Sequence, residues 1–254
     1  MGMIFDTHSH YTDHAFDGDR TALLTALPEK NVALVMQACV DLQDAVSIQH
    51  LADQYDYLYG SVGIHPENLD GGVPEDAYDQ LKVLAQHKKV RAIGEIGLDY
   101  HYDGYDRSAQ IALFRMQLAL AKELDLPVIV HARDAAADCL ELLREYRPAG
   151  VMHCFSGSAE TAREVLALGM YIGFTGVLTF QNAKKARRAL AEVPPDKLVL
   201  ETDCPYMAPV PYRGKRCDSS MIVHTADAAA QVMGLSGEQV LRLTLENGRR
   251  LYRI

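Results

Sequence analysis

Six side chains of the types that bind divalent metal ions end or follow short apolar runs of the sequence. His8 and His10 close the first run, and residues two apart on a strand point to the same side, so both imidazoles could bind one ion. Glu95 lies within another apolar run, where a carboxylate is costly unless it is paired, protonated or bound to a metal. The candidate ligands are His8, His10, Glu95, His131, His153 and Asp203.

Each of these residues also has a simpler interpretation when it is taken alone. The two N-terminal histidines could be surface residues, Glu95 could form a structural salt bridge, and a lone histidine at the end of an apolar strand is more often a satisfied core residue. However, His131 and His153 end successive apolar runs at the same depth, and Asp203 follows a third. This repetition at matching positions favours a metal site.

The residue types also indicate which chemistry such a site would perform. Imidazole and carboxylate ligands without cysteine suit zinc, manganese, iron, cobalt or magnesium. A carboxylate has two oxygens, so Glu95 can bridge two divalent metal ions, which are then expected to lie about 3.5–4 Å apart. Two such ions polarise a phosphoryl or carbonyl oxygen and activate a water molecule. We therefore predict a hydrolase with Glu95 and Asp203 as its catalytic carboxylates, the latter being both a ligand and a general base.

The elements that must position these side chains are eight apolar runs that alternate with amphipathic segments. The runs are rich in β-branched or large apolar residues, and Gly, Pro or Asp marks most of their ends. Strands are predicted at 3–8, 32–40, 57–65, 90–97, 127–132, 150–155, 170–176 and 197–202. Helical spacing predicts helices at 45–55, 75–88, 107–125, 134–146, 158–169 and 182–193, with two more near 219–233 and 236–250.

Eight strands that alternate with helices predict an α/β fold with parallel pairing through right-handed crossovers. Their number fits a closed (β/α)₈ TIM barrel of roughly 250 residues, with a doubly wound open sheet as the alternative. No Pro-, Gly- or Ser-rich linker divides the chain, so residues 1–254 are predicted to form a single domain with extra C-terminal helices. In a barrel the functional residues lie at the carboxyl ends of the strands, where the six candidate ligands are expected.

The composition fits a globular enzyme and argues against other classes of protein. The 254 residues include 25 Lys and Arg against 34 Asp and Glu, so the formal net charge is −9. Such a protein is not expected to coat nucleic acid or membranes, although it could hold a phosphodiester at one metal-neutralised site. No apolar run approaches the ~20 residues that span a bilayer. The five scattered cysteines form no CxxC pair, so a cytoplasmic location is expected.

Short motifs along the chain closely resemble those of the TatD-type metal-dependent deoxyribonucleases, within the amidohydrolase superfamily. They extend from Phe5 to the C-terminal helices and read FDTHSH, GIHP, IGEIGLDY, LPVIVHAR, MHCFSG, GFTG and ETDCPYMAP with PYRGKR. The resemblance implies a TIM barrel with a pair of divalent metal ions. It also implies that His8, His10, Glu95, His131, His153 and Asp203 are the ligands, with Glu95 bridging.

The resemblance further implies metal-dependent hydrolysis of DNA, commonly as a 3′→5′ exonuclease on single strands. Deacylation of D-aminoacyl-tRNA, an ester substrate, is the alternative, and both activities would use the same ligands. DNA is therefore the expected partner, and neither a membrane nor an obligate protein partner is indicated. A catalytically silent barrel would be expected to lack a ligand, and none is missing from the sequence.

The sequence departs from this family pattern after Arg216. There the usual Asn-Glu-Pro is replaced by Cys217, Asp218 and Ser219, in a segment that is expected near the barrel mouth. The departure therefore bears on the substrate rather than on the metals. Glu95, in place of the carbamylated lysine of other amidohydrolases, favours the TatD branch.

Four further side chains are predicted to contact the substrate. His65 ends the third predicted strand and could bind a phosphate or support a ligand. Arg133 could bind a phosphate through two hydrogen bonds or brace a neighbouring carboxylate. Arg213 and Lys215 belong, with Arg216, to a basic cluster that is expected to contact the substrate backbone rather than to form a solvated face.

Tyrosines are frequent directly after the fourth predicted strand. Tyr100, Tyr102 and Tyr105 could stack on bases, or they could belong to an ordinary loop. The sequence leaves both interpretations open.

Overall fold

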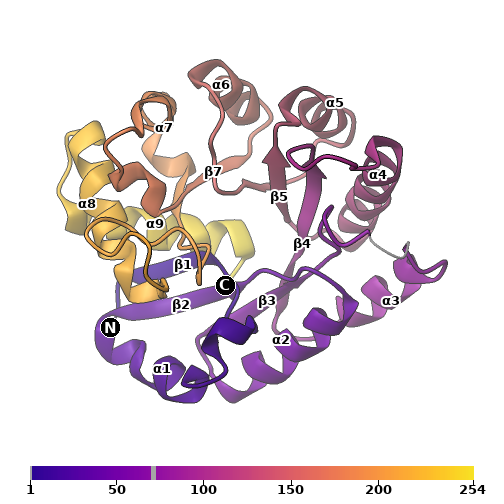
Figure 1. Cartoon of the computed structure of the whole chain (residues 1–254), viewed down its shortest axis with the longest axis horizontal. Coiled ribbons are helices and arrows are strands. Elements are labelled where there is room, and N and C mark those ends of the chain that lie inside the picture. Colours follow the sequence, from indigo (N-terminus) through magenta and orange to yellow (C-terminus); the bar gives the residue numbers. More distant parts are fainter. Residues whose placement is uncertain (1, 70–72) are drawn as a thin grey trace.

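The computed structural model describes residues 2–69 and 73–254, and its strands form one parallel sheet that curves into a ring (Figure 1). The sheet follows the order of the sequence, with β1 (Ile4–Ser9), β2 (Val32–Gln37), β3 (Leu58–Val62), β4 (Val90–Asp99), β5 (Val128–Arg133), β6 (Gly150–Met152), β7 (Tyr171–Phe174) and β8 (Leu198–Leu200). A parallel bridge joins Ser9 to Cys204, and the amide of His10 donates to the Cys204 carbonyl at 2.8 Å. These contacts bring β1 against the segment after β8. The predicted TIM barrel is confirmed, and the open sheet is excluded.

Helices cover the outer face of the sheet (Figure 1). They are α1 (Arg20–Ala26), α2 (Leu42–Gln54), α3 (Ala77–Leu84), α4 (Arg107–Leu124), α5 (Ala136–Tyr146), α6 (Ala159–Ala167), α7 (Lys184–Leu190), α8 (Ile222–Met233) and α9 (Gly237–Tyr252). Several begin at a side chain that accepts a hydrogen bond from a first-turn amide, as Asp106 does from Ala109 and Ser236 from Gln239. Within residues 2–69 and 73–254, no helix has both the length and the apolar character required for a membrane span.

The boundaries of several elements differ from the prediction. The third, sixth and eighth strands end at Val62, Met152 and Leu200, before the ligand-type residues that were assigned to their ends. The sequence also fails to predict α1, because only Leu24 among its seven residues is fully buried. A single buried residue produces no helical periodicity.

The apolar core has two parts. The larger part lies between the sheet and the helices, and the smaller part fills the barrel with side chains from the strands and from α9. Asn247 of α9 donates to the carbonyls of Pro195 and Leu198, at the start of β8. Helix α9 therefore closes the amino-terminal end of the barrel, and the opposite end remains as the mouth. The inner core consists of Phe5, Leu34, Met36, Ala92, Ile129, Val151, Val199, Leu245, Leu251 and Tyr252.

We expect Gly248→Ala to destabilise the protein, because a methyl group at this position of α9 would lie 2.5 Å from Cδ1 of Phe5. Overfilling a packed core costs about 1–3 kcal/mol, which outweighs the gain in helix propensity of at most about 1 kcal/mol. Urea denaturation should show a lower free energy of unfolding. Arg242→Ala on the exposed face of α9 is the control and should change it by less than about 0.5 kcal/mol. A Gly248→Ala protein as stable as the wild type would contradict this close packing.

Candidate metal centre

At the mouth of the barrel, the strands place polar side chains next to the inner apolar core. Ile129 on β5 and Val151 on β6 belong to the inner core, and His131 and His153 follow them by two residues. Side chains two apart on a strand point to the same face. Both imidazoles therefore point into the mouth of the barrel, although His153 lies just beyond the end of β6.

Glu95 reaches the centre of the mouth through an irregularity in β4. Ile93 and Ile96 both belong to the larger part of the core, between the sheet and the helices. Residues three apart on a regular strand would point to opposite faces, and the register of β4 against β5 shifts between these two. A shift of this kind re-aims the side chain that lies within it. The Glu95 side chain is 4% exposed. In the described part of the chain its only ion-pair partners are histidines, namely His8, His10, His65, His131 and His153.

The Oε2 atom of Glu95 faces β1 and the segment after β8. The Nε2 atoms of His8 and His10 lie 3.2 and 3.7 Å from it, and 3.1 Å from each other. Asp203 Oδ1 lies 3.6 Å from the His8 nitrogen and 3.3 Å from the His10 nitrogen. Ligand atoms that bind one ion at about 2.1 Å are separated by roughly 3–3.5 Å. The spacing of the His8, His10 and Glu95 atoms therefore fits one divalent ion, and Asp203 lies beside the two histidine nitrogens.

The Oε1 atom of Glu95 faces a second group of nitrogens. His153 Nε2 lies 2.7 Å, His131 Nδ1 3.0 Å and His65 Nε2 3.4 Å from this oxygen. The His131 and His153 nitrogens are 3.4 Å apart. This spacing fits a second ion, and Glu95 is the residue that the two groups share. His65, which the sequence predicts as a substrate residue, thus lies as close to Glu95 as candidate ligands do.

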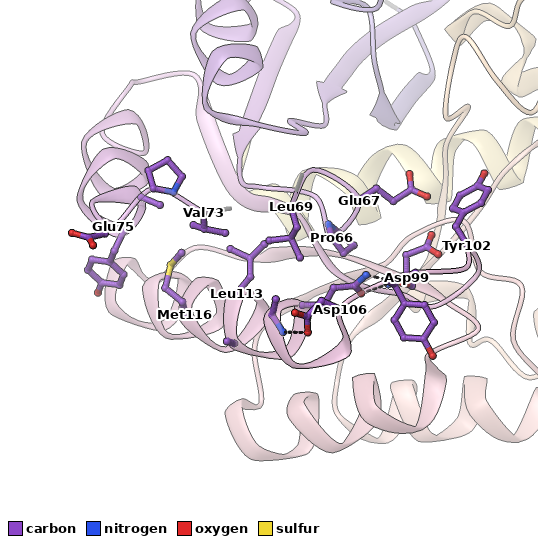
Figure 2. Close-up of a pocket in the computed structure, with 18 of the residues that line it drawn as sticks. Pro66, Glu67, Leu69, Val73, Glu75, Asp99, Tyr102, Asp106, Leu113 and Met116 are labelled. Carbon is purple, nitrogen blue, oxygen red and sulfur yellow. Dashed lines mark hydrogen bonds between the residues drawn. The ribbon is translucent and has the colours of Figure 1, made fainter. Parts of the chain in front are cut away.

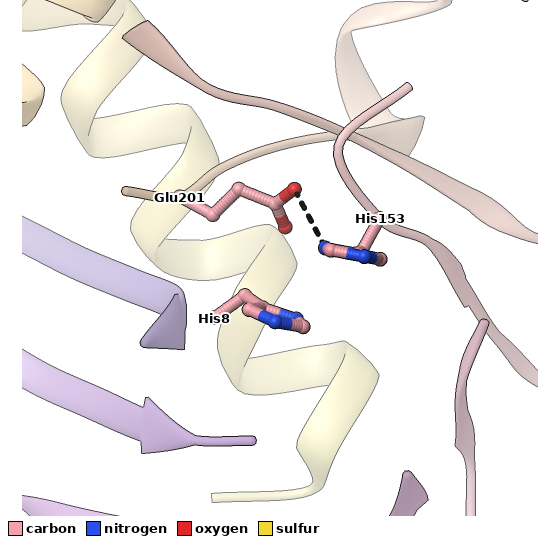
Figure 3. A group of neighbouring side chains, drawn as sticks. All are labelled: His8, His153 and Glu201. Carbon is pink, nitrogen blue, oxygen red and sulfur yellow. Dashed lines mark ion pairs between the residues drawn. The ribbon is translucent and has the colours of Figure 1, made fainter. Parts of the chain in front are cut away.

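Two further carboxylates, which were not predicted from the sequence, lie near the ring nitrogens of His131 and His153 that face away from Glu95. Asp99 Oδ2 lies 2.8 Å from His131 Nε2, and Glu201 Oε1 lies 3.6 Å from His153 Nδ1 (Figure 3). The hydrogen bond to Asp99 fixes the ring orientation and the tautomer of His131. Glu201 is beyond hydrogen-bond distance from His153 and acts on that ring through its buried negative charge. Glu201 follows Val199 of the inner core by two residues, so the alternation along β8 is the signal that could have identified it.

The charged side chains in the barrel mouth shift one another's pKa values. Burial alone would raise the pKa of Glu95, but positive charge on His153 and the neighbouring histidines holds that pKa well below its usual value. Burial alone would lower the pKa of His10, but the hydrogen bond to Asp203 and the nearby negative charge raise it to about 9. Glu95 is consequently a carboxylate at neutral pH, the form that binds cations.

Asp203 is held in place by its backbone. It lies in the left-handed region with φ of 60°, which aspartate tolerates better than most residues. Its amide donates to the carbonyl of His8 at 3.0 Å. Burial would raise the pKa of Asp203, but its hydrogen bond to His10 and the surrounding imidazoles lower it below the ordinary value.

The segment that departs from the family pattern supports β1. The Ser219 hydroxyl donates to the buried Asp6 carboxylate at 2.7 Å, and the Thr202 hydroxyl donates to the same oxygen at 2.6 Å. Cys217 is buried, and the Asp218 side chain accepts a hydrogen bond from the Ser220 amide. The departure is therefore accommodated by internal contacts beneath the loop that follows Asp203.

The predicted substrate cations differ in their surroundings. The guanidinium of Arg133 lies 5.1 Å from the ring centre of Tyr102, and that of Arg213 lies 4.5 Å from the ring of Phe180. Lys215 lies 6.0 Å from the ring of Tyr212. Among the described residues these three cations form no ion pair with a carboxylate, so Arg133 does not brace one.

Arg216, the third member of the predicted basic cluster, has a different role. It forms an ion pair with Asp19 at 2.6 Å and also donates to the carbonyl of Ala15. Arg216 thus differs from Arg213 and Lys215, since its charge is already paired with a carboxylate. This side chain ties the loop after β8 to the segment before α1.

Comparisons with known proteins agree with these observations. The family described as TatD related DNase matches residues 5–253. The uncharacterized metal-dependent hydrolase YabD of Bacillus subtilis is 39% identical over 255 residues, which cover 99% of this chain and 100% of that protein. The 3′-5′ ssDNA/RNA exonuclease TatD of Cronobacter sakazakii is 33% identical over 258 residues, which cover 98% and 97%.

A solved structure extends the agreement to the fold. The TatD homolog YJJV from Escherichia coli superposes with a TM-score of 0.93 at 30% identity, over 99% of this chain and 98% of that one. The resemblance inferred from the motifs is thus confirmed. The chain belongs to the TatD family and is a metal-dependent hydrolase.

Proposed function

We propose that this protein is a two-metal phosphodiesterase that removes nucleotides from the 3′ end of single-stranded DNA. The observation that carries the proposal is the position of Glu95, whose two oxygens face two separate groups of nitrogen and oxygen atoms. A carboxylate placed in this way can hold a pair of divalent ions side by side. Active sites of this kind catalyse the displacement of one oxygen from phosphorus by another.

In this proposal each group of atoms holds one ion. His8, His10, Asp203 and Glu95 would hold one ion, and His131, His153 and Glu95 would hold the other. His65 lies beside His131, with ring centres 4.5 Å apart, and is proposed to contact the substrate phosphate. When bound, the ions polarise the phosphoryl group and make water a better nucleophile near neutral pH.

Two further side chains are proposed to accept a proton and to bind the substrate phosphate. Asp203 is 14% exposed and therefore more open to solvent than Glu95. Its Oδ1 faces His8 and His10, so Oδ2 is proposed to accept the proton of the attacking water. Arg133, which lies two residues beyond His131 at the end of β5, is proposed to hold the phosphate through its guanidinium.

Two observations favour a nucleic acid as the substrate. Arg133, Arg213 and Lys215 form no ion pair among the described residues, so their charges remain available to a polyanion. Relatives from Cronobacter sakazakii and Dickeya dadantii are named 3′-5′ ssDNA/RNA exonucleases. YabD, at higher identity, is named as a metal-dependent hydrolase without a stated substrate.

We expect Asp203→Asn to lower turnover about 10²–10⁴-fold, since it removes both a charged ligand and the proposed general base. Asparagine also tolerates the left-handed backbone at this position, so the fold should survive. The assay is degradation of 5′-labelled single-stranded DNA by protein loaded with magnesium, manganese, zinc, cobalt or iron, and EDTA should stop it.

Asp125→Asn is the matched control for this experiment, because Asp125 also has a left-handed backbone, with φ of 50°, but pairs with Arg253 far from the candidate ligands. It should retain activity. Wild-type activity in Asp203→Asn would contradict the assigned mechanism. Hydrolysis of D-aminoacyl-tRNA but not of DNA would instead assign the deacylase function.

We expect Glu201→Gln to weaken metal binding about 10–100-fold, because it removes the buried negative charge that lies 3.6 Å from His153 Nδ1. Competition with a chromophoric chelator for zinc or manganese measures this effect, and excess metal should partly restore activity. Glu160→Gln, at an exposed position of α6, is the control. Unchanged metal affinity in Glu201→Gln would show that this carboxylate does not position the ligand.

A further inference from the structure

A groove of about 910 Å³ lies between α4 and described residues from the segment after β3, such as Glu67 and Val73 (Figure 2). Glu67, Asp99 and Tyr102 lie at one end of it, and Val73 and Met116 lie toward the other (Figure 2). The volume is within the range of about 300–1,000 Å³ that small-molecule sites occupy.

One end of the groove adjoins the candidate ligands on the Oε1 side of Glu95. Asp99, which lines it, accepts a hydrogen bond from His131, and Glu67 lies 3.9 Å from His65. The ring of Tyr102 lies beneath the guanidinium of Arg133. A substrate whose reacting phosphate lay at the metal centre could therefore extend one arm directly into the groove.

The charge of the lining restricts what this arm can be. Among the described residues that line the groove there is no lysine or arginine, while the carboxylates are Glu67, Glu75, Asp99, Asp103 and Asp106. Most of the other lining side chains are apolar or aromatic, such as Leu113 and Tyr105. A phosphate would be repelled here, whereas an uncharged ring system with hydroxyl groups would be accepted.

Two of the three unpaired cations lie across the mouth from this groove, whereas Arg133 lies at its edge, over Tyr102. Arg213 and Lys215 belong to the loop after β8, whereas the groove lies beside β3 and β4, which are about half a turn away in a ring of eight strands. The two sides of the mouth therefore differ in charge. The 3′ end of a single strand of DNA has the same asymmetry of charge. The upstream nucleotides carry a phosphate each, whereas the terminal nucleoside carries no phosphate beyond the scissile one.

We propose that the groove binds the 3′-terminal nucleoside, and that the upstream phosphates cross the loop that bears Arg213 and Lys215. This inference rests on the proposed function. Tyr102 and Tyr105 are 58% and 44% exposed. Arg133 covers one face of Tyr102 and Tyr100 stacks on one face of Tyr105, and a base would stack on the faces that remain. In the reaction, water adds to the scissile phosphorus, the bond to the upstream 3′ oxygen breaks, and that oxygen gains a proton. A 5′-mononucleotide is released, and the enzyme requires a free 3′-hydroxyl group.

The first test compares two 5′-labelled strands of the same sequence, one ending in a 3′-hydroxyl and the other in a 3′-phosphate. The hydroxyl strand should be degraded at least about tenfold faster, because the added phosphate would lie among carboxylates. The double variant Glu67→Gln, Asp103→Asn should narrow this ratio. Asp79→Asn, on α3 but outside the groove lining, should leave the ratio unchanged.

The second test fills the groove. Ala112→Trp on α4 places an indole among the lining residues, and it should slow degradation of the hydroxyl strand at least about tenfold. Hydrolysis of methyl 4-nitrophenyl phosphate, whose methyl arm is too small to need the groove, should persist. Ala119→Trp is the control at an exposed position of the same helix that does not line the groove.

The outcomes separate this inference from the proposed function. Equal rates on the two strands, or full exonuclease activity in Ala112→Trp, would overturn the groove as the nucleoside site while leaving the phosphodiesterase intact. A wild-type protein that hydrolyses neither DNA nor the small diester would overturn the proposed function, and this inference with it.

Discussion

Burial of the Glu95 carboxylate is the constraint on which the rest of the mouth depends. An ionised carboxylate that is removed from water carries a penalty of several kcal/mol unless neighbouring charges compensate it. Here the compensation comes from imidazoles on β1 and β5 and on the segments that follow β1, β3 and β6. Such a ring of nitrogen atoms around one carboxylate requires a closed barrel, because an open sheet would hold these strands apart.

The same closure separates two environments within a few residues of chain. On β5, Ile129 belongs to the inner core, and His131 lies one layer above it. The apolar layer excludes water from below, so the carboxylates that contact His131 and His153 interact in a medium of low dielectric constant. Strong orientation of the imidazoles follows from this position, and α9 contributes indirectly because it completes the apolar layer.

The fold and the six candidate ligands were predictable because both depend on local patterns, namely strand alternation and polar residues at strand ends. The alternation along β8 could have placed Glu201 in the mouth, but its position beside His153, like that of Asp99 beside His131, depends on which strands become neighbours. Pairing of Arg216 with Asp19 spans 197 positions, and no local pattern reveals such a contact. The groove likewise combines described residues from the segment after β3 with α4, which are separate in sequence. These contacts and the groove could not be predicted because they depend on how distant segments pack together, which residue types alone do not reveal.

The contact between the two ends of the sheet has a consequence for truncated copies of the enzyme. Thr202 donates to Asp6 across 196 positions, and Asp203 joins His8 and His10 only when the eighth strand has been added. A chain that lacks this strand has the histidines of β1 but not Asp203 beside them. A truncated copy therefore lacks part of the candidate metal centre, and we expect it to be inactive as a hydrolase.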